Sequence, residues 1–274
     1  QGVSSAASDV YKRQELINTM AHWIKFKHKD AIHTGILNDK EIECYEGDMF
    51  NNPSDTGKRI NLDEVELINP CNPSKMIALW NNYKTLADEK GLSKPNNPLY
   101  LNKAISCILE PGKDIVRPKS YGEAIFYEGE LGIVIGKHCK DIEANVAKNY
   151  IFGYTCINDV TGMDIVKKDP SFDQWTRSKS FDTFGIFGPG IETEIDPMNI
   201  QIQSKLNDKV VQDYNTSDMF FNVYEIVSFL SKDMSLYPGD IVACGTNAGL
   251  GPMEHGDVIQ VSLNGIGKVV NKLN

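Results

Sequence analysis

Apolar and polar residues alternate along much of the chain, and this period of two predicts β-strands. Residues 20–68 contain several short runs of this kind, such as Trp23-Ile-Lys-Phe-Lys-His and Glu41-Ile-Glu-Cys-Tyr-Glu, with a turn signal at Asn38-Asp39. Later strands are predicted at residues 75–80, 121–135, 150–157, 200–206, 240–244 and 257–263. We therefore expect a small β-rich N-terminal domain at 20–68 and a larger strand-rich domain at 70–274.

Helical patterns are confined to short parts of the chain. Residues 220–234 carry apolar and small side chains at helical spacing, and residues 82–90 form a short helical pattern that ends at Gly91, a usual C-cap residue. Since strands and helices do not alternate regularly, the pattern argues against a doubly wound fold or a TIM barrel. It favours an α+β, β-rich fold.

Composition and charge exclude several classes of protein. Apolar residues make up 41% of the chain and charged residues 24%, which is typical of globular proteins. The net charge of −9 repels phosphate backbones, so we expect no nucleic-acid partner. No apolar run approaches the ~20 residues that span a bilayer, so we expect no membrane association.

The six cysteines are widely scattered and form no C-x-x-C pair. This spacing predicts neither a zinc site nor a compact disulfide framework. We expect reduced, mostly buried thiols in a cytoplasmic protein, and no apolar segment follows Lys12-Arg13 to form a secretory signal.

The first residues differ in character from the rest. Residues 1–14 begin with Gln1 and show no periodicity that continues into the following chain. The string from Ser4 to Gln14 looks like read-through of a cloning adapter. We expect residues 1–19 to be a non-native or disordered tail, with the natural chain starting at or a little before Met20.

Three acidic residues form the main candidate for chemistry. Glu128 and Glu130 lie two apart in a predicted strand, so they face the same way, with Cα atoms roughly 7 Å apart. Asp159 follows another predicted strand. Unpaired carboxylates on a buried strand need a cation, and hard oxygen ligands suit Mg²⁺, Mn²⁺ or Ca²⁺. The glycine between the glutamates would leave room for a ligand. Spacing alone also allows an exposed edge strand with solvated acids.

Four motifs in chain order carry a family resemblance. They are Tyr127-Glu-Gly-Glu-Leu-Gly-Ile-Val-Ile-Gly136, Phe152-Gly-Tyr-Thr-Cys-Ile-Asn-Asp-Val-Thr161, Lys179-Ser-Phe-Asp-Thr-Phe184 and Gly245-Thr-Asn-Ala-Gly-Leu-Gly251. Over residues 70–274 the chain resembles the fumarylacetoacetate hydrolase superfamily. Residues 20–68 resemble the small N-terminal domain of members related to hydroxyheptadienedioate isomerases. The resemblance implies a mixed β-roll catalytic domain with the active site at its mouth, a small-molecule substrate and a homodimer.

The resemblance also implies roles for individual residues. Glu128, Glu130 and Asp159 match the ligand positions for a divalent metal, Mg²⁺ or Mn²⁺. Lys179 matches the active-site lysine, although from its own neighbourhood it would be read as a surface residue. In the glycine-rich segment, Gly245 and Thr246 match positions that bind the substrate carboxylate, and the usual proline after the threonine is replaced by Asn247.

Other positions depart from the family pattern. Many hydrolytic and decarboxylating members carry a histidine and a glutamate one helical turn apart in a lid helix, where they activate water. This chain keeps Glu89, a candidate proton shuttle, but has Leu86 in place of the histidine. An arginine and a glutamine that family members often carry near the third acid correspond to Met163 and Val166.

Three functions are therefore considered. The first is an isomerase or tautomerase of a 2-oxo (di)carboxylic acid, similar to 2-hydroxyhepta-2,4-diene-1,7-dioate isomerase, working through a metal-held enolate with Lys179 or Glu89 moving the proton. The second is a C–C hydrolase or decarboxylase of acylpyruvates or similar β-diketo acids. The third is a non-catalytic metal or metabolite binder. The absence of the lid histidine favours the first over the second.

Overall fold

A mixed sheet runs through the structure, a computed structural model that describes residues 21–274. The strands are β1 (His22–His28), β2 (Ala31–Asn38), β3 (Glu41–Glu46), β4 (Ser54–Asn61), β5 (Glu66–Ile68), β6 (Met76–Trp80), β7 (Leu99–Lys103), β8 (Ile108–Leu109), β9 (Ile125–Tyr127), β10 (Gly129–Ile135), β11 (Ile151–Asp159), β12 (Thr161–Gly162), β13 (Gly185–Glu192), β14 (Gln201–Leu206), β15 (Lys209–Asn215), β16 (Ile241–Ala243), β17 (Gly251–Met253), β18 (Val258–Leu263) and β19 (Gly267–Lys272). The prediction for residues 1–19 lies outside the described range.

The strand order mixes local hairpins with long-range pairs. The large sheet has the order β4-β3-β2-β1-β13-β11-β10-β16-β6-β7, with β5 beside β1 and β8 beside β13. The pairs β16–β6 and β13–β8 are parallel, whereas the others in this sheet are antiparallel. Two smaller sheets have the orders β12-β9-β17 and β15-β14-β18-β19. The predicted α+β, strand-rich class is confirmed.

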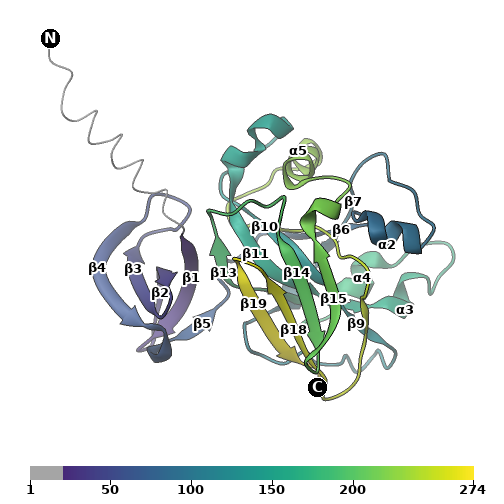
Figure 1. The fold of residues 1–274 in the computed structure, drawn as a ribbon, viewed down its shortest axis with the longest axis horizontal. Helices are drawn as coiled ribbons and strands as arrows, with labels where there is room; N and C mark the ends of the chain where they lie inside the picture. Colours follow the sequence, from purple (N-terminus) through teal and green to yellow (C-terminus); the bar gives the residue numbers. More distant parts are fainter. Residues whose placement is uncertain (1–20) are drawn as a thin grey trace, which may run out of the picture.

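The N-terminal strands form a unit beside the larger body (Figure 1). This unit has its own small core, which contains Ile24, Phe26, Ile42, Cys44 and Ile60. Strand β1 also pairs antiparallel with β13, whose sequence lies more than 150 residues further along the chain. The N-terminal unit is therefore hydrogen-bonded into the main sheet rather than merely tethered to it.

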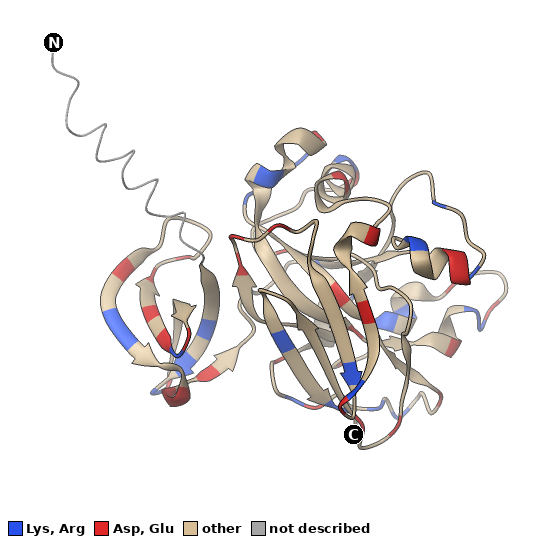
Figure 2. Ribbon diagram, in the orientation of Figure 1, with Lys and Arg blue, Asp and Glu red and all other residues tan. Residues whose placement is uncertain are grey.

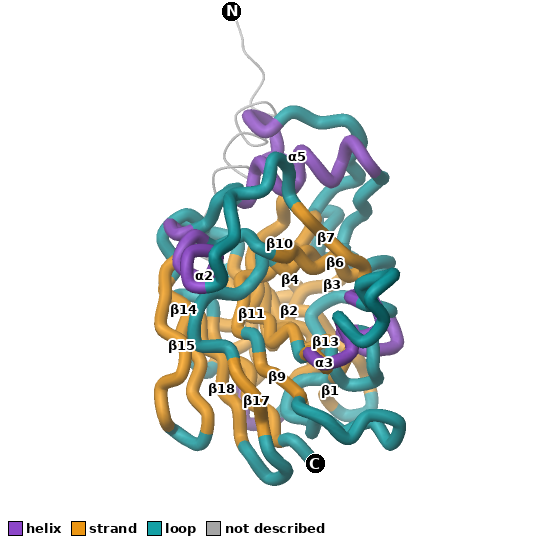
Figure 3. Tube along the Cα trace, turned by 90° about the vertical axis from the view of Figure 1, so that its right-hand side faces the viewer, coloured by secondary structure: helices purple, strands orange, loops and turns teal. Residues whose placement is uncertain are grey.

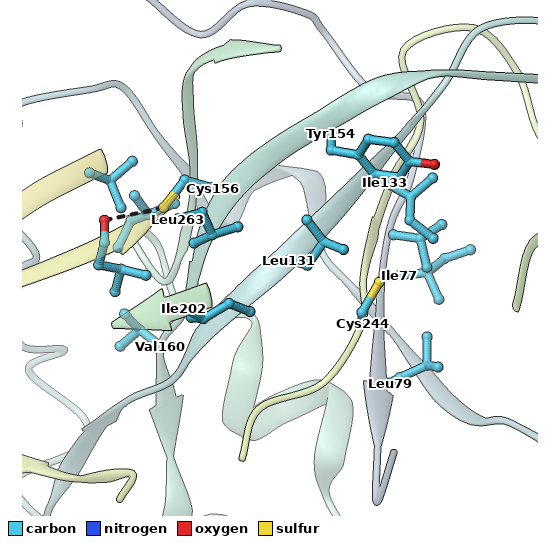
Figure 4. Close-up of a cluster of buried hydrophobic side chains, with 14 of the residues drawn as sticks. Ile77, Leu79, Leu131, Ile133, Tyr154, Cys156, Val160, Ile202, Cys244 and Leu263 are labelled. Carbon is cyan, nitrogen blue, oxygen red and sulfur yellow. Dashed lines mark hydrogen bonds between the residues drawn. The ribbon is translucent and has the colours of Figure 1, made fainter. Parts of the chain in front are cut away.

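The main core lies where the four-stranded sheet covers β10 and β11. Leu131, Ile202 and Leu263 meet there from β10, β14 and β18, as Figure 4 shows. Cys156 lies in the same cluster and its thiol donates to the Val261 carbonyl at 3.2 Å. All six cysteines are buried and unpaired, as the spacing predicted. This packing fixes β10 and β11, the strands that carry the acidic residues.

Helices are short and lie around the strands (Figure 3). They are α2 (Lys84–Glu89), α3 (Met163–Val166), α4 (Trp175–Lys179) and α5 (Val223–Asp233), with 3-10 turns at Leu62–Glu64, Ile105–Cys107, Ala144–Tyr150 and Thr216–Asp218. Helix α5 begins with a capping box formed by Asn222 and Glu225, which satisfies its first N–H groups. Within residues 21–274 no helix has the length and apolar character that a bilayer crossing would need.

Charged residues are distributed over both parts of the molecule. Figure 2 shows Lys on β1, Glu on β3, residues of both signs on β4, and residues of both signs on the larger body, whereas β2 carries no charged residue. Acidic and basic residues are thus found in both parts of the fold in this view.

The strand predicted as one run from residue 121 to 135 is divided in the structure. It forms β9, which pairs with β12 and β17, and β10, which pairs with β11 and β16. Glu128 is the junction, and its backbone N–H donates to the Asn158 side chain at 3.1 Å. The prediction of a continuous strand was wrong because the chain passes from one sheet to another at this residue.

Candidate functional site

Three acidic side chains converge at the junction of β9, β10 and β11. One carboxylate oxygen each from Glu128, Glu130 and Asp159 lies within 4.8 Å of the others, and all three side chains are buried. Gly129 of β10 pairs with Asn158 of β11. This pairing sets the arrangement, because it places Glu128 and Glu130, the neighbours of Gly129, beside Asp159, the neighbour of Asn158. The structure thus brings together the three residues that the sequence singled out as metal ligands.

Two buried lysines face the acidic cluster. Lys179, at the end of α4, donates to Glu128 Oε2 at 2.8 Å and to Asp159 Oδ2. Lys103, at the end of β7, donates to Asp159 Oδ1 and to the Phe184 carbonyl at 3.1 Å. Both ammonium groups are almost completely shielded from solvent. Lys179 therefore lies at the site, as the resemblance implied, and is not a surface residue.

The cluster has more carboxylates than ammonium groups to compensate them. Three ionised carboxylates would exceed the two ammonium groups by one negative charge, and Glu130 Oε1 is buried without a hydrogen-bond partner in residues 21–274. Burial, with the nearby Asp159, raises the pKa of Glu130 well above its usual range. Buried charge of this kind is costly unless a cation compensates it. The donor set therefore fits a hard divalent cation held by oxygen.

Both lysines lower the pKa of Asp159, in opposition to the effect of burial. Burial alone would raise the pKa of Asp159, but the ammonium groups of Lys103 and Lys179 outweigh it, and the pKa is lowered. Burial raises the pKa of Glu128 despite its contact with Lys179. Asp159 is thus the carboxylate that the protein itself holds most firmly in the ionised state.

The glycine-rich segment closes one side of the cluster. The Gly245 N–H donates to Glu130 Oε2 at 2.7 Å, so it orients a carboxylate of the protein and is not free for a substrate. Thr246 donates its hydroxyl to the Gly129 carbonyl at 3.0 Å and accepts from Gln212 Nε2 at 2.9 Å. Of the two predicted substrate-binding residues, Thr246 borders the cavity described below and Gly245 supports Glu130.

Gly129, between the two glutamates, faces away from the cluster. A Cβ at this position would lie 2.4 Å from Ser204 Oγ and 3.0 Å from Val261 Cγ1. The expectation that this glycine leaves room for a ligand was wrong, because alternation along β10 turns position 129 toward the four-stranded sheet. Its role is to let that sheet pack closely.

Substitution of Gly129 by alanine is expected to destabilise the protein by about 1–3 kcal/mol through overpacking. Urea unfolding followed by circular dichroism measures this loss. Gly122→Ala is the control, since an added Cβ there meets nothing within 4 Å. Equal midpoints for the two variants would contradict the proposed packing role.

A cavity of about 50 Å³ lies beside the cluster. Glu128, Lys179 and Thr246 line its polar end. Leu86 and Met163, the positions where the family pattern led us to expect a histidine and an arginine, also line it. Val166 is buried, whereas Glu89 is exposed at the end of α2, and neither lines the cavity. The structure therefore does not bring Glu89 to the acidic cluster, and its role in proton transfer stays a prediction.

Helix α2 is fixed by side chains from distant parts of the chain. The Leu86 N–H donates to Asn247 Oδ1, and the Thr85 N–H donates to Asp218 Oδ2, both at 3.0 Å. Asn247 Nδ2 in turn donates to Asp218 Oδ2 at 2.9 Å. These bonds satisfy helix N-terminal N–H groups that have no local cap. Asn247, noted in the sequence only as a missing proline, thus joins α2 to the glycine-rich segment.

Sequence reasoning missed Lys103. A signal was present, because Leu99-Tyr-Leu-Asn-Lys103 alternates and places Lys103 on the same face as the buried Leu101. A lysine on the apolar face of a strand needs a buried partner. The pattern would have predicted such a partner but not that it is Asp159.

Comparison with known families follows the same division of the chain. Residues 75–274 match the family model "Fumarylacetoacetate (FAA) hydrolase C-terminal". Residues 21–70 match the model "Rv2993c-like, N-terminal".

Known relatives include enzymes of more than one reaction type. Oxaloacetate tautomerase Fahd2a, mitochondrial, from Rattus norvegicus is 33% identical over 211 residues, which are 73% of this chain and 66% of that protein. The 2-hydroxyhepta-2,4-diene-1,7-dioate isomerase from Mycobacterium marinum is 33% identical, with a TM-score of 0.84 over 92% of this chain and 98% of its own. Maleylpyruvate hydrolase from Sphingobium sp. SYK-6, solved with manganese(II) and pyruvate, is 25% identical, with a TM-score of 0.73 over 92% and 98%.

Proposed function

Because the chain belongs to the fumarylacetoacetate hydrolase family, we propose that it is a divalent-metal-dependent enzyme that isomerises or tautomerises a 2-oxo acid through an enolate. The observation that carries this proposal is the buried cluster of Glu128, Glu130 and Asp159. Lys179 contacts two of these acids and also lines the cavity beside them. Relatives with isomerase and tautomerase activity support the reaction type.

The acidic residues would hold the metal. Glu128, Glu130 and Asp159 offer the oxygen donors that Mg²⁺ and Mn²⁺ prefer, and Glu130 Oε1 is without another partner in residues 21–274. When bound, such an ion supplies Lewis acidity that favours the enolate form of a 2-oxo acid. Lys103 holds Asp159 from the side opposite Lys179, since the two lysines bond different oxygens of its carboxylate.

Lys179 is the group proposed to act on the substrate. Its ammonium lines the cavity and is paired with two carboxylates, which keeps it charged and oriented. As an ammonium it would stabilise the negative charge of the enolate and donate a proton to the carbon next to the 2-oxo group, which gives the keto form.

The wall that faces Lys179 favours proton transfer over hydrolysis. Leu86 occupies the place of a water-activating histidine, and Glu89 is exposed outside the cavity. A general base is typically worth 10²–10⁴ in rate, so attack by water is expected to be slow. This is the reason to propose isomerisation or tautomerisation as the main reaction.

The test uses chelator-stripped protein with acetylpyruvate and oxaloacetate, two 2-oxo acids whose enol and keto forms can be followed by absorbance. Enol–keto conversion and pyruvate release are measured separately, without metal and with Mg²⁺ or Mn²⁺. We expect metal-dependent conversion without pyruvate release from at least one of the two acids.

The other outcomes identify the alternatives. Pyruvate formed at the rate of substrate loss would replace the proposal with a hydrolase or decarboxylase. Tight metal binding with neither signal would replace it with a non-catalytic binder.

A further inference from the structure

The cavity has a polar end and an apolar wall. Apart from Glu128, Lys179 and Thr246, its lining is dominated by leucine, methionine and tryptophan side chains. They are Leu79 and Trp80 of β6, Leu86 of α2, Leu92 after that helix, Met163 of α3, Trp175 of α4 and Leu250 of the glycine-rich segment, and Asn81 and Lys90 complete the lining. Since these residues come from separate parts of the chain, the wall is not simply the inner face of one amphipathic element.

Two of these wall residues are held by buried parts of the fold. The Leu86 N–H donates to Asn247, which is only 2% exposed. Met163 begins α3, a helix whose Ile165 and Val166 are buried. Leu86 and Met163 therefore present apolar side chains to whatever occupies the cavity.

No buried cation is available for a second negative group. Among the described lining residues the lysines are Lys179, which is committed to Glu128 and Asp159, and Lys90. Lys90 is exposed and follows the last residue of α2, where a cation complements the helix carbonyls. A carboxylate placed against the leucine side chains would lose its hydration without a buried partner.

We infer that the substrate is a 2-oxo monocarboxylate whose group beyond the 2-oxo acid is a short, uncharged aliphatic chain, and that Leu86 and Met163 select it. This inference rests on the proposed function. A volume of about 50 Å³ holds a handful of water molecules, so the chain is short.

The experiment measures binding to the Mg²⁺-loaded protein by calorimetry and, separately, deuterium exchange at C3 by NMR. The ligands are pyruvate, 2-oxobutanoate, 2-oxopentanoate and 2-oxoglutarate. The last two have five carbons each and differ in a terminal methyl or carboxylate. Each added methylene is expected to tighten binding by about 4-fold while space remains. 2-Oxoglutarate should bind at least about 10-fold more weakly than 2-oxopentanoate, since its terminal carboxylate loses hydration.

Variants assign the selectivity to the wall. Met163→Gln, close to methionine in size but polar, should reduce the preference for 2-oxopentanoate over 2-oxoglutarate by about 10-fold, because the amide can meet a carboxylate. Lys84→Gln, an exposed change on α2 outside the lining, is the matched control and should leave the ratio unaltered.

Each result decides between two claims. Equal or tighter binding of 2-oxoglutarate that is lost in Lys90→Gln would overturn the inference and assign Lys90 to a second carboxylate. If 2-oxoglutarate binds as tightly or more tightly but deuterium still exchanges at C3, the result would still support the proposed function. If affinity increases with the length of the aliphatic chain but no acid exchanges deuterium at C3, the inference would be upheld and the proposed function would be refuted. Absence of binding by all four acids would overturn both.

Discussion

Replacing Lys179 with methionine should lower kcat for conversion of the enol to the keto form by about 10²–10⁴-fold, the usual contribution of a positioned proton-transfer group. The side chain is buried, lines the cavity and contacts both Glu128 and Asp159. Methionine keeps much of its length but cannot carry a proton or a charge. Steady-state kinetics at saturating Mg²⁺ measures the loss, and calorimetric titration with Mg²⁺ shows whether the metal still binds.

Arg177→Met provides the matched control for that variant. Arg177 is an exposed cation on the same short helix and makes no ion pair in residues 21–274. Its loss should leave kcat within about a factor of two, since Arg177 does not line the cavity and surface substitutions rarely change stability by more than ~0.5 kcal/mol. A Lys179→Met enzyme with the rate of Arg177→Met would refute the role of Lys179 in proton transfer.

Replacing Lys103 with methionine should destabilise the metal-free protein by about 3–5 kcal/mol, because a buried charge pair loses one partner. Asp159 and Lys103 are both fully buried, and the acidic cluster would keep Lys179 as its remaining ammonium group. A bound divalent cation compensates part of that charge, so Mg²⁺ should raise the stability of the variant more than that of the parent protein. Urea unfolding with and without Mg²⁺ measures both effects.

Lys113→Met removes a lysine from an exposed ion pair with Glu66, in which the charged atoms are 3.6 Å apart. Exposed pairs contribute about 0–1 kcal/mol, so this variant should unfold close to the parent midpoint. If Lys103→Met cost no more than Lys113→Met, Asp159 would not depend on Lys103 for its charge.

The pattern of apolar and polar residues predicted a strand well wherever one continuous stretch of that pattern forms a single strand. The buried strand β6 and the strands β14 and β18 lie within or close to their predicted ranges. The break at Glu128 was not predictable, because the apolar character continues from β9 into β10 while the pairing partners change. Alternation reports which face a residue occupies but not which sheet its strand joins.

The candidate site shows the same limit. Glu128 and Glu130 share a face by alternation alone, Asp159 was a candidate from its place after another predicted strand, and the family resemblance added Lys179. The partnership of Lys103 with Asp159 spans 56 residues, and that of Asn247 with Leu86 spans 161. Such contacts depend on strand order and on the path of the glycine-rich segment, which residue spacing does not encode.

The pairing of β1 with β13 has a consequence for the handling of this protein. Strand β13 has β11 on one side, and on the other its register with β1 covers Gly190 to Glu192. A truncated chain without residues 21–68 would leave these backbone groups open beside Ile191, whose side chain packs with Trp23 in the intact protein. Open edges of this kind recruit strands from other molecules. We therefore expect the N-terminal unit to protect this edge of the main sheet against aggregation, so that its removal would give an aggregation-prone chain rather than a minimal enzyme.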